Sequence, residues 1–88
     1  MIYQIRFTPR AERDLKSLSR QIQSKVEKKI QNLAENPLPS GVKKLIGEKN
    51  LYRIRVGDYR IVYTVESGKL IVLIITIKHR REFIADGF

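Results

Sequence analysis

The feature that most constrains the fold is a break in regular secondary structure at residues 36–41, where Asn-Pro-Leu-Pro-Ser-Gly contains two prolines and a glycine. Proline lacks the backbone N–H and glycine favours turns, so neither a helix nor a central strand continues through such a segment. The sequence before the break has the spacing of helices, and the sequence after it has the alternation of strands. The break therefore predicts an α+β protein whose helices precede most of its sheet.

The first half is predicted to contain one strand and a helical hairpin. Residues 2–7 alternate imperfectly, which indicates a short strand. Thr8 followed by Pro9 is typical of a helix start, and we place the helices at about residues 9–18 and 20–35, with Ser19 capping the second. Apolar residues recur at helical spacing at Leu15, Leu18, Ile22, Val26, Ile30 and Leu33.

The second half is predicted to contain three strands joined by tight turns, after a basic connector. We expect the order β-α-α-β-β-β in one domain spanning residues 1–88, with the helical hairpin packed on one face of a small, mainly antiparallel four-stranded sheet. The last strand is apolar on both faces, which favours a central position. The connector is 42–50, the strands are Leu51–Val56, Tyr59–Val65 and Leu70–Lys78, and the turns are Gly57-Asp58 and Ser67-Gly68.

Composition narrows the classes of function. The chain has 18 Lys and Arg against 9 Asp and Glu, a formal net charge of +9. Such an excess favours a polyanionic partner, namely nucleic acid, the ribosome, an acidic protein or an anionic membrane, although a lysine-rich soluble surface is the simpler alternative. The absence of cysteine excludes a disulfide scaffold and a thiolate zinc site, and a single histidine argues against a histidine-built metal site.

Targeting and membrane signals are absent from the sequence pattern. The longest apolar run, Leu70–Ile77, is too short to span a bilayer, and the N-terminus does not have the pattern of a signal peptide. We therefore expect a cytoplasmic protein that uses no metal and no cofactor.

An arginine-bearing face is predicted for the hairpin with the Gly-Asp turn. With a two-residue turn, Val56 stands opposite Tyr59, and counting back places Arg55 opposite Arg60. Arg53 then shares their face. Opposed like charges weaken a hairpin, so the arrangement favours a phosphate site over three arginines that simply extend across an open sheet face. The other face, suited to packing on the helices, holds Tyr52, Ile54, Val56, Tyr59, Ile61 and Tyr63.

A second candidate group, Lys-His-Arg-Arg-Glu, follows the last strand. Continued alternation from Ile75 and Ile77 predicts that His79 lies on the arginine face. Histidine is the side chain whose ordinary pKa suits proton transfer near neutral pH, although a lone histidine is also common in an exposed basic tail. Together the two groups predict metal-free cleavage of RNA. The arginines would stabilise the transition state, His79 would take or give a proton, and the 2′-OH would be the nucleophile.

At these residues the sequence resembles the RelE/ParE superfamily of toxins from type II toxin–antitoxin systems, in particular its RelE-like branch. The matching segments are Lys44–Gly47, Leu51–Tyr63 and His79–Glu82, and the order of elements matches over nearly the whole chain. The resemblance implies cleavage of messenger RNA in the A site of the 70S ribosome, which inhibits translation. It implies neither a small-molecule cofactor nor a membrane as partner. It also implies a cognate antitoxin protein as partner, and it suggests that the first strand lies beside the last.

The resemblance further implies roles for individual residues. The implied catalytic set is Arg53, Arg55, Arg60, His79 and Arg80. We expect RNA to contact Lys43, Lys44, Lys78, Arg81 and Phe83. Relatives with a histidine at position 79 usually have a tyrosine five residues later, where this chain has Ile84. Arg55 does not act as a base, because a guanidinium stays protonated.

Three other functions are compatible with the sequence. A ParE-like toxin would poison DNA gyrase without cleaving RNA. A catalytically weakened member, which Ile84 keeps in consideration, would act mainly as a partner of its antitoxin. A general basic RNA-binding module would bind RNA without cutting it, and its affinity would fall steeply with salt.

Overall fold

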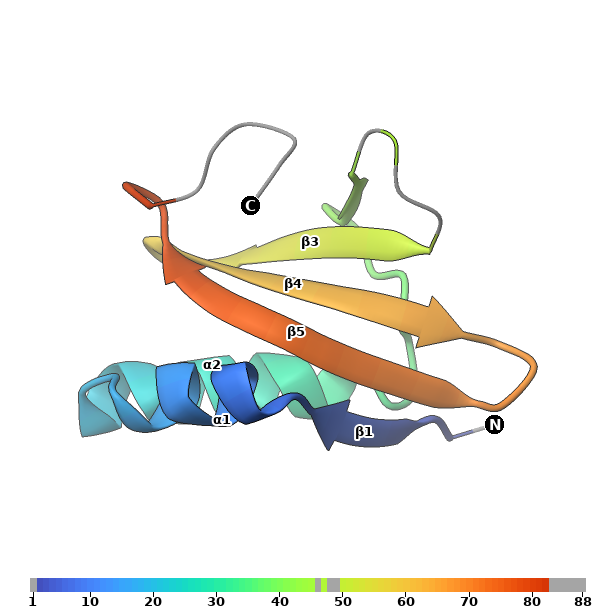
Figure 1. Cartoon of the computed structure of the whole chain (residues 1–88), viewed down its shortest axis with the longest axis horizontal. Coiled ribbons are helices and arrows are strands. Elements are labelled where there is room, and N and C mark those ends of the chain that lie inside the picture. Colours follow the sequence, from blue (N-terminus) through green and yellow to red (C-terminus); the bar gives the residue numbers. More distant parts are fainter. Residues whose placement is uncertain (1, 46, 48–49, 83–88) are drawn as a thin grey trace.

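The structure is a computed structural model that describes residues 2–45, 47 and 50–82. Both helices lie on the same side of the sheet (Figure 1), which confirms the α+β class and the helical hairpin. None of the helices in these parts of the chain is long and apolar enough to cross a membrane. In chain order the elements are β1 (Gln4–Phe7), α1 (Pro9–Lys16), α2 (Arg20–Asn32), β2 (Lys43–Lys44), β3 (Leu51–Val56), β4 (Tyr59–Glu66) and β5 (Ile71–His79).

The sheet has five strands in the order β1-β5-β4-β3-β2. β1 runs parallel to β5, as expected for a first strand beside the last, and the other neighbours are antiparallel. The expected four-stranded sheet is wrong, because part of the basic connector forms β2 and pairs with β3. A strand of two residues is too short to have an alternating pattern, so the sequence carried no sign of it.

Side-chain caps begin both helices. The Thr8 hydroxyl accepts a hydrogen bond from the Ala11 N–H at 3.0 Å, and the Ser19 hydroxyl accepts one from the Ile22 N–H at 3.4 Å. Both helices end a few residues earlier than expected. Beyond α2, the N–H of Ala34 donates to the carbonyl of Gln31, three residues back, which is the tighter geometry common where an α-helix ends.

The main core lies between the helices and the sheet. The predicted apolar face of the β3–β4 hairpin packs into it. Tyr63 is fully buried there, and its hydroxyl donates a hydrogen bond to the carbonyl of Pro37 at 2.7 Å. This bond links the segment of residues 36–41 to the sheet. The buried residues of this core are Ala11, Val26, Ile30, Leu33, Ile54, Ile61, Tyr63, Val65, Val72, Ile74 and Ile77.

A β-bulge interrupts β5 near its middle. Val62 of β4 pairs with Thr76, whereas the next residue, Tyr63, pairs with Ile74, so Ile75 is an extra residue in β5. Ile74 packs in the main core, and Ile75 packs with a smaller cluster of Leu45, Leu51 and Val62. An extra residue shifts the alternation by one, so every side chain beyond the bulge lies on the opposite face from the one that unbroken alternation gives it.

Candidate functional site

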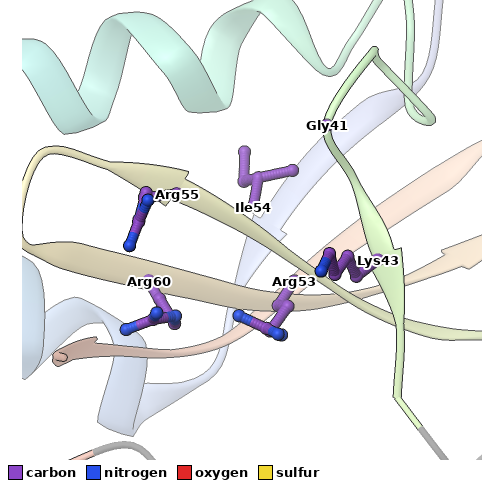
Figure 2. Close-up of a pocket in the computed structure, with 6 residues that line it drawn as sticks. All are labelled: Gly41, Lys43, Arg53, Ile54, Arg55 and Arg60. Atoms are coloured by element: carbon purple, nitrogen blue, oxygen red, sulfur yellow. The ribbon is translucent and has the colours of Figure 1, made fainter. Parts of the chain in front are cut away.

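The predicted register of the β3–β4 hairpin is confirmed. Arg55 lies opposite Arg60, and Arg53 lies opposite Val62. Alternation therefore places the three arginines on one face of the hairpin. Figure 2 shows Ile54, which belongs to the main core, pointing away from their guanidinium groups. The arginines thus occupy the face of the sheet that does not meet the helices.

A pocket of about 200 Å³ opens on this face. Strand β2 forms one wall, because Lys43 lies opposite Arg53 (Figure 2). Its lining residues within the described chain bring four cationic side chains and no carboxylate. They are Gly41, Lys43, Arg53, Ile54, Arg55 and Arg60. The pocket therefore offers a bound anion several charged donors at once.

The cationic side chains act on one another. Partial burial and the charges of Arg53, Arg55 and Arg80 lower the pKa of Arg60 from its ordinary value. The charged form of Arg60 is therefore less stable here than in water, and an anion bound beside it would stabilise that form. We call Arg53, Arg55, Arg60 and Arg80 the arginine cluster.

Arg80 reaches this cluster from beyond the end of β5. Its backbone N–H donates to the carbonyl of Asp58 at 2.7 Å, and its guanidinium Nε lies 3.8 Å from an Asp58 carboxylate oxygen. Asp58 belongs to the turn between β3 and β4. The turn that sets the register of β3 and β4 therefore also holds Arg80 in place.

The expectation that His79 shares the arginine face is wrong. His79 lies opposite Tyr59, and the two rings make an edge-to-face contact with centroids 5.2 Å apart. Tyr59 packs against the main core on the helix side. The bulge at Ile75 is the cause, because Ile75 and Ile77 pack in different clusters and alternation between them does not hold. The Nδ1 atom of His79 accepts a hydrogen bond from the Arg81 N–H at 3.1 Å.

The same shift brings Lys78 to the arginine face, because Lys78 lies opposite Arg60. Lys44 lies opposite Tyr52, so the register directs it to the face away from the pocket, and Arg81 is exposed just beyond β5. Phe83 and Ile84 lie outside the described residues.

Gly41 is the pocket residue that the sequence reasoning missed. Its φ of +90° suits glycine and lets the chain turn out of the proline break into β2. The sequence signal that could have identified Gly41 as a pocket residue is its position two residues before Lys43. In the parts of the chain that the structure describes, no three His, Asp or Glu side chains are grouped to hold a metal ion.

Comparisons with known proteins identify the family. The sequence-family model described as the ParE toxin of the type II toxin–antitoxin system parDE matches residues 5–83. The chain belongs to the RelE/ParE superfamily of toxins. A protein described as a RelE-like toxin from Escherichia coli is 34% identical over 83 residues, which are 91% of this chain and 85% of that protein. A toxin named RelE1 from Methanocaldococcus jannaschii is 31% identical and matches 91% of this chain and 92% of its own length.

Solved structures place this toxin on the RelE-like side of the superfamily. The archaeal RelE–RelB complex from Pyrococcus horikoshii has a chain that superposes with a TM-score of 0.82 at 28% identity, covering 94% of this chain and all (100%) of that one. The RelBE2 toxin–antitoxin complex from Mycobacterium tuberculosis gives a TM-score of 0.80 at 32% identity, covering 91% and 100% of the two chains. The resemblance to RelE-like toxins is thereby confirmed over nearly the whole chain.

Proposed function

We propose that this RelE-like toxin is a metal-independent endoribonuclease that cleaves messenger RNA in the ribosomal A site and so inhibits translation. The observation that carries the proposal is the open pocket lined by Arg53, Arg55 and Arg60, where the charge of Arg80 also acts on Arg60. A substrate phosphate is the natural counterion for such a group. Membership of the RelE/ParE superfamily supports the assignment.

In the proposed reaction, the 2′-OH of the RNA loses its proton to water as the 2′-oxygen attacks the adjacent phosphorus, and the bond to the 5′-oxygen breaks. The products are a 2′,3′-cyclic phosphate and a 5′-hydroxyl. Negative charge develops on the phosphoryl oxygens in the transition state, and the forks of Arg53, Arg55 and Arg60 stabilise it. RNA is the substrate rather than DNA because the nucleophile is the RNA's own hydroxyl.

His79 is proposed as the proton donor to the leaving 5′-oxygen. Donation requires the imidazolium form, in which both ring nitrogens carry protons, so the hydrogen bond from the Arg81 N–H to Nδ1 is released when His79 acts. Because His79 lies on the helix side, RNA held by the arginine cluster meets it only around the end of β5. Lys78, opposite Arg60, contacts the RNA backbone on the cluster's own face.

A cognate antitoxin is proposed as the toxin's protein partner, because solved relatives are described as complexes of RelE with RelB. A groove of about 190 Å³ between β1 and α2 provides an apolar seat on the helix side. It is lined by Ile5, Phe7, Glu27, Ile30 and Gln31. With messenger RNA and the 70S ribosome, this completes the proposed set of partners.

The decisive experiment is the mapping of 5′ ends on a short messenger RNA bound to programmed ribosomes, with and without the toxin. We expect cuts inside the A-site codon that are absent on free RNA and lost with Arg60→Ala. The matched control is Lys28→Ala, which removes the same charge from an exposed position on α2 and should cut normally. Cuts that persist with Arg60→Ala would overturn the role of the cluster, and the absence of any cuts would overturn the nuclease.

A ParE-like action on DNA gyrase is the second candidate, because the matching family model is that of ParE toxins. The substitution of Ile84 for the tyrosine of RelE-like relatives also favours a lost or weakened nuclease. Induction of the toxin in cells separates these functions. A DNA-damage response with intact messenger RNA indicates gyrase, and growth without any defect indicates a weakened member that mainly binds its antitoxin.

A further inference from the structure

At the bulge, the edge of β5 away from β4 is held by α1 and its cap residue Thr8 rather than by another strand. β1 pairs with β5 only as far as Phe7 and Ile74, so the next backbone groups on that edge of β5 need other partners. Thr8, which caps α1, supplies two of them. Its N–H donates to the carbonyl of Ile74 at 3.0 Å, and its hydroxyl donates to the carbonyl of Ile75 at 2.7 Å.

Asp14 of α1 supplies the other contact. One carboxylate oxygen of Asp14 accepts a hydrogen bond from the Thr76 hydroxyl at 2.7 Å and another from the Ile77 N–H at 3.0 Å. Thr76 is 1% exposed, so its hydroxyl has little access to water as a substitute partner. Both bonds fall immediately after the extra residue Ile75, at the point where β5 resumes its pairing with β4.

The bulge decides which side chain faces the arginine cluster. In an unbroken β5, His79 would stand on that face and Lys78 on the helix side. With the bulge in place, Lys78 lies opposite Arg60 and His79 lies opposite Tyr59. Whatever stabilises the bulge therefore selects an ammonium group instead of an imidazole as the neighbour of Arg60.

We propose that Asp14 is a positioning residue for the RNA site, because its hydrogen bonds to Thr76 and Ile77 fix the bulge that places Lys78 beside Arg60. Asp14 does not contact RNA, and its effect on binding passes entirely through Lys78. The inference depends on the proposed function for the identity of its ligand.

A double-mutant cycle on RNA affinity tests the coupling. The probe is a short single-stranded RNA with 2′-O-methyl groups, which the 2′-OH mechanism does not cleave. Asp14→Ala and Lys78→Met should each weaken binding about fivefold, and each should reduce the salt dependence by about one counterion. The double variant should bind no more weakly than Lys78→Met alone. Asp14→Asn retains an oxygen acceptor and should bind within about twofold of the unaltered toxin.

Additive losses in the double variant would overturn the proposal, because a general weakening of the fold does not depend on Lys78. A measurement on the free toxin covers the case in which Asp14→Ala does not fold. Thr76→Val keeps the side-chain volume and removes one of the two hydrogen bonds to Asp14. We expect faster amide exchange at Ile77 and a weaker nuclear Overhauser contact between the α-protons of Tyr59 and His79, the close cross-strand pair next to Arg60 and Lys78. Unchanged contacts and exchange would contradict the proposal.

The two proposals fail separately. Coupled binding losses without any cutting on ribosomes overturn the nuclease and leave the positioning role in place. Normal cutting and normal RNA affinity with Asp14→Ala overturn the positioning role and leave the nuclease in place.

Discussion

Arg55 and Arg60 stand directly opposite each other on neighbouring strands, one pair away from the turn that joins β3 to β4. Cross-strand partners in this position have their side chains close together, so the two guanidinium groups repel. Burial first, and then the charges of Arg53, Arg55 and Arg80, lower the pKa of Arg60. The repulsion therefore costs the folded toxin some stability, which an anion bound at the proposed site would restore.

Replacing Arg55 by Gln should raise the free energy of unfolding by about 0.5 kcal/mol at low salt, because it removes one like-charged neighbour. The gain should shrink at high salt, where the repulsion is screened. Urea denaturation at two salt concentrations measures both effects. Arg13→Gln, at an exposed position on α1, is the control and should change little. Loss of stability with Arg55→Gln at low salt would show that repulsion is not what this pair contributes.

Replacing Gly57 by Ala should destabilise the toxin by about 1 kcal/mol, because Gly57 has a φ of +57° that an L-residue adopts with strain. Gly68 is the matched control, since it lies in another turn and does not have a left-handed φ. A Cβ added at Gly68 would have no neighbouring atoms within 4 Å. Gly68→Ala should leave the free energy of unfolding within about 0.5 kcal/mol of its original value. Equal effects at the two positions in thermal or urea denaturation would contradict this account.

The stability of the toxin should fall in alkaline solution through Tyr63. Burial, with a smaller contribution from Tyr52, raises the pKa of Tyr63 above its ordinary value. The unfolded chain releases the phenolic proton near pH 10, whereas the folded chain retains it, so stability is complete below about pH 10 and declines above it. The decline from this one group approaches about 1.4 kcal/mol per pH unit.

Tyr63→Phe should flatten this alkaline slope. It should also cost about 1 kcal/mol near neutral pH, because the hydrogen bond to the carbonyl of Pro37 is lost. Urea denaturation in steps from about pH 8 to about pH 11 separates the two effects. Identical slopes for the two proteins would mean that Tyr63 does not carry the alkaline loss.

The two helix caps should differ in their importance. Thr8→Ala should cost about 2 kcal/mol, because the Thr8 hydroxyl both caps α1 and donates to the carbonyl of Ile75 in the bulge. Ser19→Ala should cost about 0.5 kcal/mol, since its bond to the Ile22 N–H is exposed and 3.4 Å long. The free energies of unfolding of the two variants measure the difference, and a larger loss with Ser19→Ala would reverse the expected order.

Prediction from the sequence succeeded where local chemistry determines the structure. The Gly-Asp turn and the alternation around it determined the register of the β3–β4 hairpin, and with it the shared face of Arg53, Arg55 and Arg60. The cap signals at Thr8 and Ser19 likewise marked where the helices begin. In each case the deciding residues lie within a few positions of the feature that they specify.

Prediction failed where the deciding contact is distant in the sequence. Residues 70–77 are apolar on both faces, so a bulge at Ile75 leaves no mark in the hydrophobic pattern. The residues that hydrogen-bond to the bulge are Thr8, the cap of α1, and Asp14 on α1, both in the first part of the chain. The placement of His79 was wrong for that reason. Strand β2 was not predicted because it consists of two lysines, and the strand it pairs with, β3, follows it in the sequence.

The parallel pairing of β1 with β5 has a consequence for the timing of synthesis. Thr8 and Ile75, which hydrogen-bond across this junction, lie 67 positions apart in the chain. During translation β1, α1 and α2 emerge well before the strand that they pack against, so they wait with their apolar surfaces uncovered. The core closes and Lys78 meets Arg60 in one late step, when β5 arrives. A polypeptide that ends before β5 therefore lacks Lys78 beside Arg60, and its cationic face is incomplete.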